Sequence, residues 1–136
     1  MSNTTEKYAV IGAGPCGLSA IRCFQKQGIP VQGFEAHSGV GGLWDISNPL
    51  STVYQSAHLI SSKKMTEYKE YPLGDHVADY PHHSEIKNYF NGFAKHFNLK
   101  ELIKFNTRIL NCVRDEKTTL WTITYETEGK KYTEEY

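Results

Sequence analysis

The sequence predicts an α/β fold that opens with a parallel β-α-β unit and ends in an antiparallel β-meander. Three observations support this class. An apolar run at residues 8–11 leads directly into the glycine-rich GAGPCG, apolar residues recur at helical spacing after Pro15, and period-two alternation dominates beyond Asn98. At 136 residues the chain has room for one domain with a single core.

The first elements are predicted as strand, helix and strand. Residues 8–11, YAVI, form a short apolar strand. Apolar residues three and four apart predict a helix from Pro15 to Gln27, and Gly28 supplies its stop. VQGFE, residues 31–35, is predicted as the second strand. This order is typical of a parallel sheet, in which ligands bind beyond the carboxyl ends of the strands.

The middle of the chain is predicted as a long, loop-rich connection, because periodicity mostly fails across residues 36–81. Helical spacing returns over residues 84–97, where aromatic side chains form one face that must be buried. Residues 103–115 and 120–126 alternate with period two and are predicted as strands. TEGKK, residues 127–131, is then a hairpin turn into the last strand, YTEEY.

Composition places few limits on function. Lys plus Arg and Asp plus Glu both number 15, so no net field favours nucleic acid or an anionic membrane as a partner. The first thirty residues contain no apolar run of signal-peptide or membrane-span length, which predicts a cytoplasmic protein without a membrane span. Cys16, Cys23 and Cys112 form no CxxC pair and are odd in number, so we interpret them as reduced thiols.

Gly12, Gly14 and Gly17 form a GxGxxG motif between the first strand and the helix. Gly12 allows a tight turn, Gly14 lets the backbone approach a pyrophosphate, and Gly17 lets the helix pack closely on the strand. The helix N-terminus then faces the phosphate with its amides and positive dipole, and Pro15 lies where a missing N–H costs nothing. The alternative is a glycine-rich turn without a ligand, but the strand-turn-helix context favours a ligand.

Glu35 ends the second strand, eighteen residues after Gly17. A carboxylate there accepts hydrogen bonds from ribose hydroxyls and repels the 2′-phosphate of NADP, which leaves FAD or NAD as the fitting ligand. A second glycine-rich stretch, SGVGGLWD at residues 38–45, is expected to pass the phosphate and sugar of the same ligand with backbone alone. Trp44 then lies toward the ring system or packs beneath it, and Cys16 is either an activated thiolate or simply a small residue.

Together, GAGPCG, Glu35 and GGLW resemble the single-component flavoprotein monooxygenases, the class that includes flavin-containing monooxygenases and Baeyer–Villiger enzymes. The resemblance continues through VYQSAHLISSKKMTEYKEYPL and YPHHSEIKNYFNGFAKHFNL and covers nearly the whole chain. It implies a Rossmann-like FAD-binding domain of the GR2 type, with Leu59 and Ile60 near the flavin ring and Val113 at the adenine. The FAD-binding residues that it implies are Gly12, Ala13, Gly14, Pro15, Cys16, Gly17, Glu35, Gly42, Leu43, Trp44, Leu59, Ile60 and Val113.

The resemblance also implies an enzyme that reduces FAD with NADPH and oxygenates small N-, S- or carbonyl-containing molecules through a flavin hydroperoxide. It assigns residues 1–136 to the N-terminal portion of the FAD-binding domain, incomplete at the C-terminus and without the NADPH domain, which a second chain would supply. Ile60 stands where many flavin-containing monooxygenases carry Asn, so it offers no side-chain hydrogen bond there. No residue is assigned as a catalytic acid or base.

Two alternatives of other classes stay open. In the first, the chain is a non-catalytic FAD-binding fragment or half of a two-chain enzyme, since the family continues into further sequence. In the second, it belongs to an FAD-dependent oxidase or dehydrogenase.

The histidines and one further motif have simpler interpretations. FNGFAKH, residues 90–96, matches the start of the FxGxxxH fingerprint associated with these monooxygenases, but it lies in the predicted helix and we interpret it as coincidence. His76, His82 and His83 lack the spacing of a metal site, so no metal is predicted. His58 is structural or donates to the flavin.

Two lysines and three aromatic residues receive default interpretations. Lys63 and Lys64 are interpreted as a solvated pair, the alternative being contact with phosphate. Trp121, on a period-two strand, is most simply a core residue, as are Tyr89 and Phe90 on the predicted helix.

Overall fold

A parallel sheet of three strands in the order β1-β2-β3 lies at the centre of the computed structural model, which describes residues 6–136. β1 (Tyr8–Ile11) leads into α1 (Pro15–Lys26), and β2 (Val31–Phe34) returns parallel to β1. β3 (Ile103–Lys104) pairs in parallel with the other side of β2. The predicted opening β-α-β unit is therefore confirmed, with its elements ending within a residue of the expected bounds.

A second sheet forms the predicted meander. β4 (Thr107–Arg114), β5 (Trp121–Thr127) and β6 (Lys130–Glu135) pair antiparallel in sequence order. Glu128 and Gly129 connect the last two strands with φ of 52° and 72°, the positive values that a tight type I′ hairpin turn requires. The turn is thus shorter than TEGKK, because the flanking residues already belong to strands.

One strand prediction was wrong. Residues 103–115 do not form a single strand of the meander, because β3 belongs to the parallel sheet and only β4 belongs to the second sheet. Asn106 separates them with φ of 50°, and Thr107 N–H already donates to the carbonyl of Glu35 at 2.9 Å. The alternating pattern continues across this bend, so periodicity alone does not reveal it.

The span at residues 36–81 is loop-rich as predicted and contains only a 3-10 turn, η1 (Gly42–Trp44), and the single turn of α2 (Lys63–Thr66). α3 (His83–His96) follows, and η2 (Leu99–Leu102) leads into β3.

A capping box starts α3. The ring of His82 accepts a hydrogen bond from the N–H of Ser84 at 3.3 Å, and the carboxylate of Glu85 accepts one from the N–H of His82 at 3.0 Å. Two otherwise unpaired amides of the first turn are satisfied in this way. His82 therefore has a structural role at the beginning of this helix.

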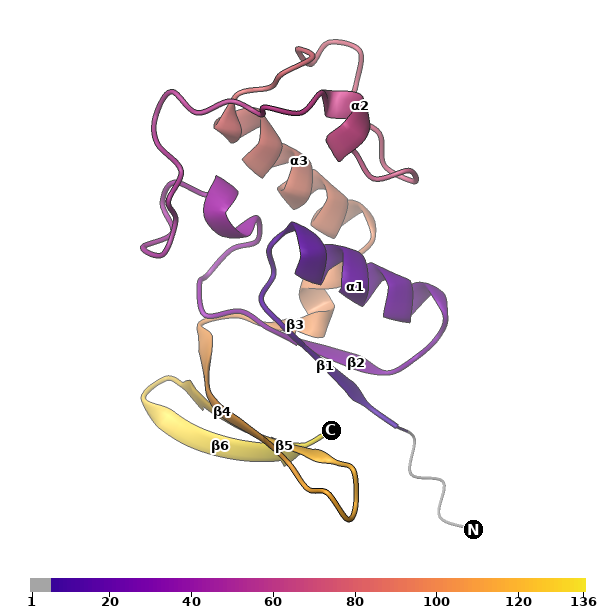
Figure 1. The fold of residues 1–136 in the computed structure, drawn as a ribbon, viewed down its shortest axis with the longest axis vertical. Helices are drawn as coiled ribbons and strands as arrows, with labels where there is room; N and C mark the ends of the chain where they lie inside the picture. Colours follow the sequence, from indigo (N-terminus) through magenta and orange to yellow (C-terminus); the bar gives the residue numbers. More distant parts are fainter. Residues whose placement is uncertain (1–5) are drawn as a thin grey trace.

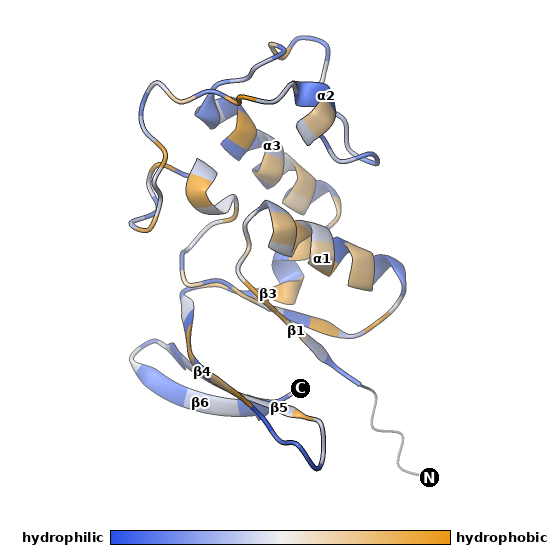
Figure 2. Ribbon diagram, viewed as in Figure 1, coloured by the Kyte–Doolittle hydropathy of each residue, from blue (hydrophilic) through white to orange (hydrophobic). Residues whose placement is uncertain are grey.

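The elements form three layers, with α1 and α3 on one face of the parallel sheet and the meander on the other (Figure 1). Figure 2 shows apolar residues along both helices and a mostly hydrophilic β6. The smaller core, between the two sheets, consists of Phe34, Ile123 and Tyr125. The larger core, between helices and sheet, contains Ala13, Leu18, Ile21, Val40, Leu59, Leu73, Ile86, Tyr89, Phe90, Phe93, Ala94, Leu99 and Ile103.

The core predictions for the aromatic residues had mixed outcomes. Tyr89 and Phe90 are buried, as predicted. Trp121 is not a core residue, since 47% of it is exposed. It alternates in step with buried Ile123 on β5, but it lies at the end of the meander beside β1, the edge strand of the parallel sheet. No strand among residues 6–136 covers it there.

Candidate functional site

The turn between β1 and α1 presents amide groups without partners. Gly12 has φ of 94°, a value that favours glycine, and Gly14 is the N-cap of α1 without a side-chain capping bond. Pro15 occupies the start of the helix, as predicted. The structure assigns no hydrogen-bond acceptor among residues 6–136 to the N–H groups of Gly14, Cys16 or Gly17. Such amides at a helix N-terminus suit an anion such as a pyrophosphate.

Gly17 packs against the turn in the way that its motif position predicts. A Cβ atom on Gly17 would lie 1.9 Å from the carbonyl oxygen of Gly12, a distance that no side chain can tolerate. A Cβ atom on Gly14 would instead meet only the Cα of Gly42, at 3.7 Å. The two glycines therefore differ in kind, since the fold itself requires Gly17 and leaves room for a methyl group at Gly14.

The second glycine-rich stretch lies directly on the first. The N–H of Gly41 donates to the carbonyl of Ala13 at 3.0 Å, and Gly42 has φ of 58°. A Cβ atom on Gly42 would lie 3.0 Å from the Cα of Gly14. The backbone that lies closest to SGVGGLWD is therefore that of the turn at residues 12–17, and the two stretches form one continuous surface.

Glu35 is buried beside this surface. One carboxylate oxygen accepts a hydrogen bond from the N–H of Ala13 at 2.6 Å, and the other accepts one from the N–H of His37 at 2.8 Å. The carboxylate thus connects the end of β2 to the turn at residues 12–17. A carboxylate has about four acceptor sites, so two amide donors leave capacity for hydroxyl groups. The role of Glu35 toward ribose stays a prediction.

Leu43 and Trp44 lie on η1. Leu43 is half exposed, whereas Trp44 is partly buried and packs against the larger core. Asp45, which follows, is only 4% exposed and pairs with Lys87 Nζ of α3 at 2.7 Å. Burial alone raises the pKa of Asp45, but hydrogen bonds from Lys87 and Ser47 outweigh it and lower that pKa below its usual range.

Asp45 is a residue that sequence reasoning missed. It fixes the end of the glycine-rich stretch to α3, and through it the position of Trp44. No spacing distinguishes Asp45 from a solvated acid, since its partner lies in a helix far along the chain.

The remaining predicted cofactor residues are Leu59, Ile60 and Val113, and Leu59 belongs to the same core as Ala13 of the turn. Leu59 is buried and Ile60 almost fully exposed, with the N–H of Leu59 donating to the carbonyl of Pro81 at 2.9 Å. Val113 lies on β4 and is more than half exposed. Within residues 6–136, no hydrogen bond joins these residues to the turn or to η1. Their roles toward flavin and adenine stay predictions.

The two lysines of α2 differ, and the interpretation as a solvated pair was wrong for Lys63. Lys63 is buried, and its Nζ donates to the carbonyls of Gly74 at 3.3 Å and Val77 at 2.5 Å. It therefore holds the following loop and is not free to meet a phosphate. Lys64 is exposed and pairs with Glu67 at 3.3 Å. The single turn of α2 directs one lysine inward, which the letters KK do not indicate.

Histidines and cysteines have no shared site. In the part of the chain that the structure describes, no group of three or more His, Cys, Asp or Glu side chains is arranged to hold a metal ion. The ring of His58 is exposed and bonds the carbonyl of Ser56 at 3.0 Å. Cys16, Cys23 and Cys112 are free thiols.

Comparison with known proteins decides the family. A sequence model described as flavin-binding monooxygenase-like matches residues 5–136. The chain belongs to the flavin-binding monooxygenase-like family. The predicted resemblance and the α/β fold class are thereby confirmed. Within residues 6–136, no helix of this family member is long and apolar enough to cross a membrane.

Individual relatives agree with the family. The chain is 33% identical over 135 residues to flavin-containing monooxygenase 5 of Homo sapiens and 37% identical over 135 residues to flavin-containing monooxygenase 3 of Rattus norvegicus. Each match covers 94% of this chain and 25% of the relative. A solved structure of an oxidized steroid monooxygenase bound to NADP has a TM-score of 0.80 and 32% identity, over 93% of this chain and 24% of that one. This family member therefore spans about a quarter of the length of these relatives.

Proposed function

We propose that residues 1–136 are the N-terminal part of the FAD-binding domain of an NADPH-dependent flavoprotein monooxygenase. One observation carries the proposal. The turn at residues 12–17, with its unpaired amides, packs backbone to backbone on Gly41 and Gly42, so two glycine-rich stretches form one surface open to a phosphate. Family membership and the NADP-bound steroid monooxygenase among the structural relatives support the same conclusion. The substrates proposed are small N-, S- or carbonyl-containing molecules, and the free cysteines support a cytoplasmic protein.

In this proposal the amides of Gly14, Cys16 and Gly17 bind the pyrophosphate of FAD, and Glu35 binds its ribose. FAD supplies the redox chemistry and the activation of dioxygen when bound, while the chain supplies binding, orientation and exclusion of water. Trp44, fixed against the core and next to the Asp45–Lys87 ion pair, limits solvent access along one side. The other residues proposed to contact FAD are Gly12, Ala13, Pro15, Gly42, Leu43, Leu59, Ile60 and Val113.

The deciding experiment is Gly14→Ala, with retained flavin absorbance measured after incubation with FAD and gel filtration. The added methyl group meets only ordinary van der Waals contact, so we expect the thermal unfolding midpoint to stay within a few degrees. Because the same methyl group would stand between backbone and pyrophosphate, we expect FAD affinity to fall at least about tenfold, which is about 1.4 kcal/mol.

Gly17→Ala is the matched control. Its methyl group would lie 1.9 Å from the Gly12 carbonyl, so this variant should lose its fold and its flavin together. A Gly14→Ala chain that binds FAD as tightly as the wild type would contradict the phosphate role of the turn.

A separate experiment tests the activity itself. It measures oxygen consumption with NADPH and amine, sulfide or ketone substrates, on a longer polypeptide that includes the part of the relatives' length outside residues 1–136. Stoichiometric peroxide would instead favour an oxidase.

A second candidate function, half of a two-part enzyme, is favoured by a groove along the free edge of β1. The groove has a volume of about 860 Å³ and is lined by exposed Tyr8, Ile11, Leu120 and Trp121. An edge strand with apolar neighbours is suited to pair with an added strand. We propose that a strand from the part of the relatives' length outside this chain, in the same or a second polypeptide, occupies it.

A further inference from the structure

Tyr68 contacts the phosphate turn at a point that no motif marks. It lies between α2 and α3, and its hydroxyl donates to the carbonyl of Pro15, the first residue of α1, at 2.5 Å. Its ring packs against Phe93 of α3 with the ring centroids 4.3 Å apart. The hydrogen bond therefore connects the start of α1 to an aromatic cluster whose residue Tyr68 lies more than fifty positions later in the sequence.

Tyr68 is itself held in place. Its backbone N–H donates to the hydroxyl of Tyr89 at 2.6 Å, and that hydroxyl donates to the carbonyl of Tyr71, also at 2.6 Å. Burial raises the pKa of the Tyr68 hydroxyl above its ordinary value, so the hydroxyl stays a donor at all physiological pH values. The position of the Pro15 carbonyl is thus set from α3 through two linked tyrosines.

Few side chains hold this turn. Among residues 6–136, side chains hydrogen-bond residues 12–17 at only two places, Glu35 with the N–H of Ala13 and Tyr68 with the carbonyl of Pro15. Gly14 carries no side chain to cap the helix, and Pro15 has no N–H. Glu35 therefore fixes the entry of the turn and Tyr68 fixes its exit.

We propose that Tyr68 is a positioning residue of the FAD pyrophosphate site, whose hydroxyl holds the first turn of α1 so that the amides of Cys16 and Gly17 face the ligand. The inference rests on the proposed FAD binding. Amides that are already oriented bind an anion more tightly, because less ordering is required on binding. Tyr68 itself does not touch FAD in this proposal.

Tyr68→Phe tests the proposal, with Tyr71→Phe as the matched control. Tyr71 belongs to the same aromatic cluster, with its ring centroid 5.5 Å from that of Tyr89, but its hydroxyl makes no hydrogen bond within residues 6–136. Both variants keep the ring and lose one hydroxyl. We expect Tyr68→Phe to raise the Kd for FAD about five- to tenfold, and Tyr71→Phe to change it less than about twofold.

Amide hydrogen exchange without FAD supplies an independent measurement. We expect the amides of residues 13–19 to exchange at least about threefold faster in Tyr68→Phe and to be unchanged in Tyr71→Phe. Equal effects of the two variants overturn the proposal, as does an affinity change without faster exchange, or faster exchange without an affinity change. If the wild-type chain binds no FAD, the proposed function fails, while the exchange comparison still decides whether Tyr68 holds the turn.

Discussion

Glu35 combines two tasks that its position at the end of β2 makes possible. Its two oxygens accept hydrogen bonds from the N–H groups of Ala13 and His37. One buried carboxylate therefore fixes both the turn after β1 and the chain just after β2. Charge-assisted bonds of this kind are stronger than neutral ones. The residue that we propose for ribose binding is therefore also a structural part of the turn at residues 12–17.

We predict that Glu35→Gln destabilises the fold by about 1–3 kcal/mol and weakens FAD binding. The glutamine amide has nearly the same shape, but only its oxygen accepts, so its NH₂ group must face one of the two backbone N–H donors. Urea unfolding of the chain measures the loss. Glu116→Gln, at an exposed position in the β4–β5 turn, is the control and should unfold like the wild type. Equal stability of the two variants would show that the amide bonds to Glu35 matter little.

Elements with a strong local signal were predictable from the sequence. β1 and the start of α1 follow from an apolar run that meets GAGPCG, and β2 follows from VQGF. The expectation that both glycine-rich stretches line one ligand stays a prediction, and the direct packing of Gly42 on Gly14 was not predicted.

Features set by distant parts of the chain were not predictable. Lys63 is buried because carbonyls of a later loop surround its Nζ, and β3 leaves the meander because β2 offers a parallel edge. Trp121 has the alternation of a core residue, yet it is 47% exposed, because within residues 6–136 no strand pairs with β1 on the side away from β2. In each case the local sequence pattern is intact, and contacts with distant residues decide whether the side chain is buried or which sheet the strand joins.

The edge of β1 leads to a prediction about association. We expect the chain alone to self-associate with increasing concentration, because the apolar groove beside β1 then takes a second copy in place of the proposed strand. Trp121→Glu should remain monomeric in sedimentation velocity without loss of stability, since Trp121 is 47% exposed. Leu50→Glu replaces an apolar residue that is 67% exposed but lies outside the groove, so this control should associate like the wild type. A monomeric wild-type chain at all concentrations would count against the two-part candidate.

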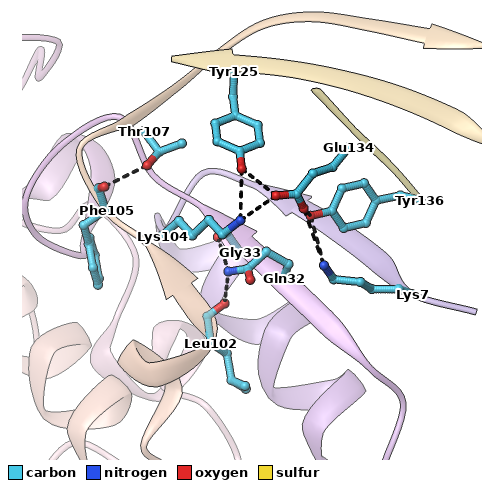
Figure 3. A network of polar contacts seen from close by, with 10 residues as sticks. All are labelled: Lys7, Gln32, Gly33, Leu102, Lys104, Phe105, Thr107, Tyr125, Glu134 and Tyr136. Atoms are coloured by element: carbon cyan, nitrogen blue, oxygen red, sulfur yellow. Dashed lines mark hydrogen bonds and ion pairs between the residues drawn. The ribbon is translucent and has the colours of Figure 1, made fainter. Parts of the chain in front are cut away.

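The whole molecule is held together by a polar network between its two sheets (Figure 3). Glu134 of β6 accepts hydrogen bonds from Lys104 Nζ of β3 at 2.8 Å, from the Tyr125 hydroxyl at 2.5 Å and from the Tyr136 hydroxyl at 2.6 Å. Lys7, just before β1, approaches the same carboxylate at 3.6 Å. Within residues 6–136 the smaller core between the sheets has three buried apolar side chains and four partly buried ones, so this polar network adds substantially to the contact between the meander and the parallel sheet.

The network predicts an acid-sensitive stability. Burial alone raises the pKa of Glu134, but the hydrogen bonds from Lys104, Tyr125 and Tyr136 outweigh it and lower that pKa to about 2. A folded-state pKa below the ordinary value of 4.5 means that Glu134 stabilises the fold above about pH 4.5 and loses this contribution as the pH falls toward 2.

Glu134→Gln should therefore unfold at a lower temperature than the wild type at pH 6, and the difference should shrink steadily between pH 4.5 and pH 2. Thermal unfolding followed by circular dichroism at half-unit pH steps measures this difference, and comparison with the wild type cancels the titration of other acids. Glu135→Gln is the control, because Glu135 is exposed, is adjacent on β6 and makes no ion pair within residues 6–136. A gap between Glu134→Gln and wild type that stays constant down to pH 2 would mean that the carboxylate charge does not dock the meander.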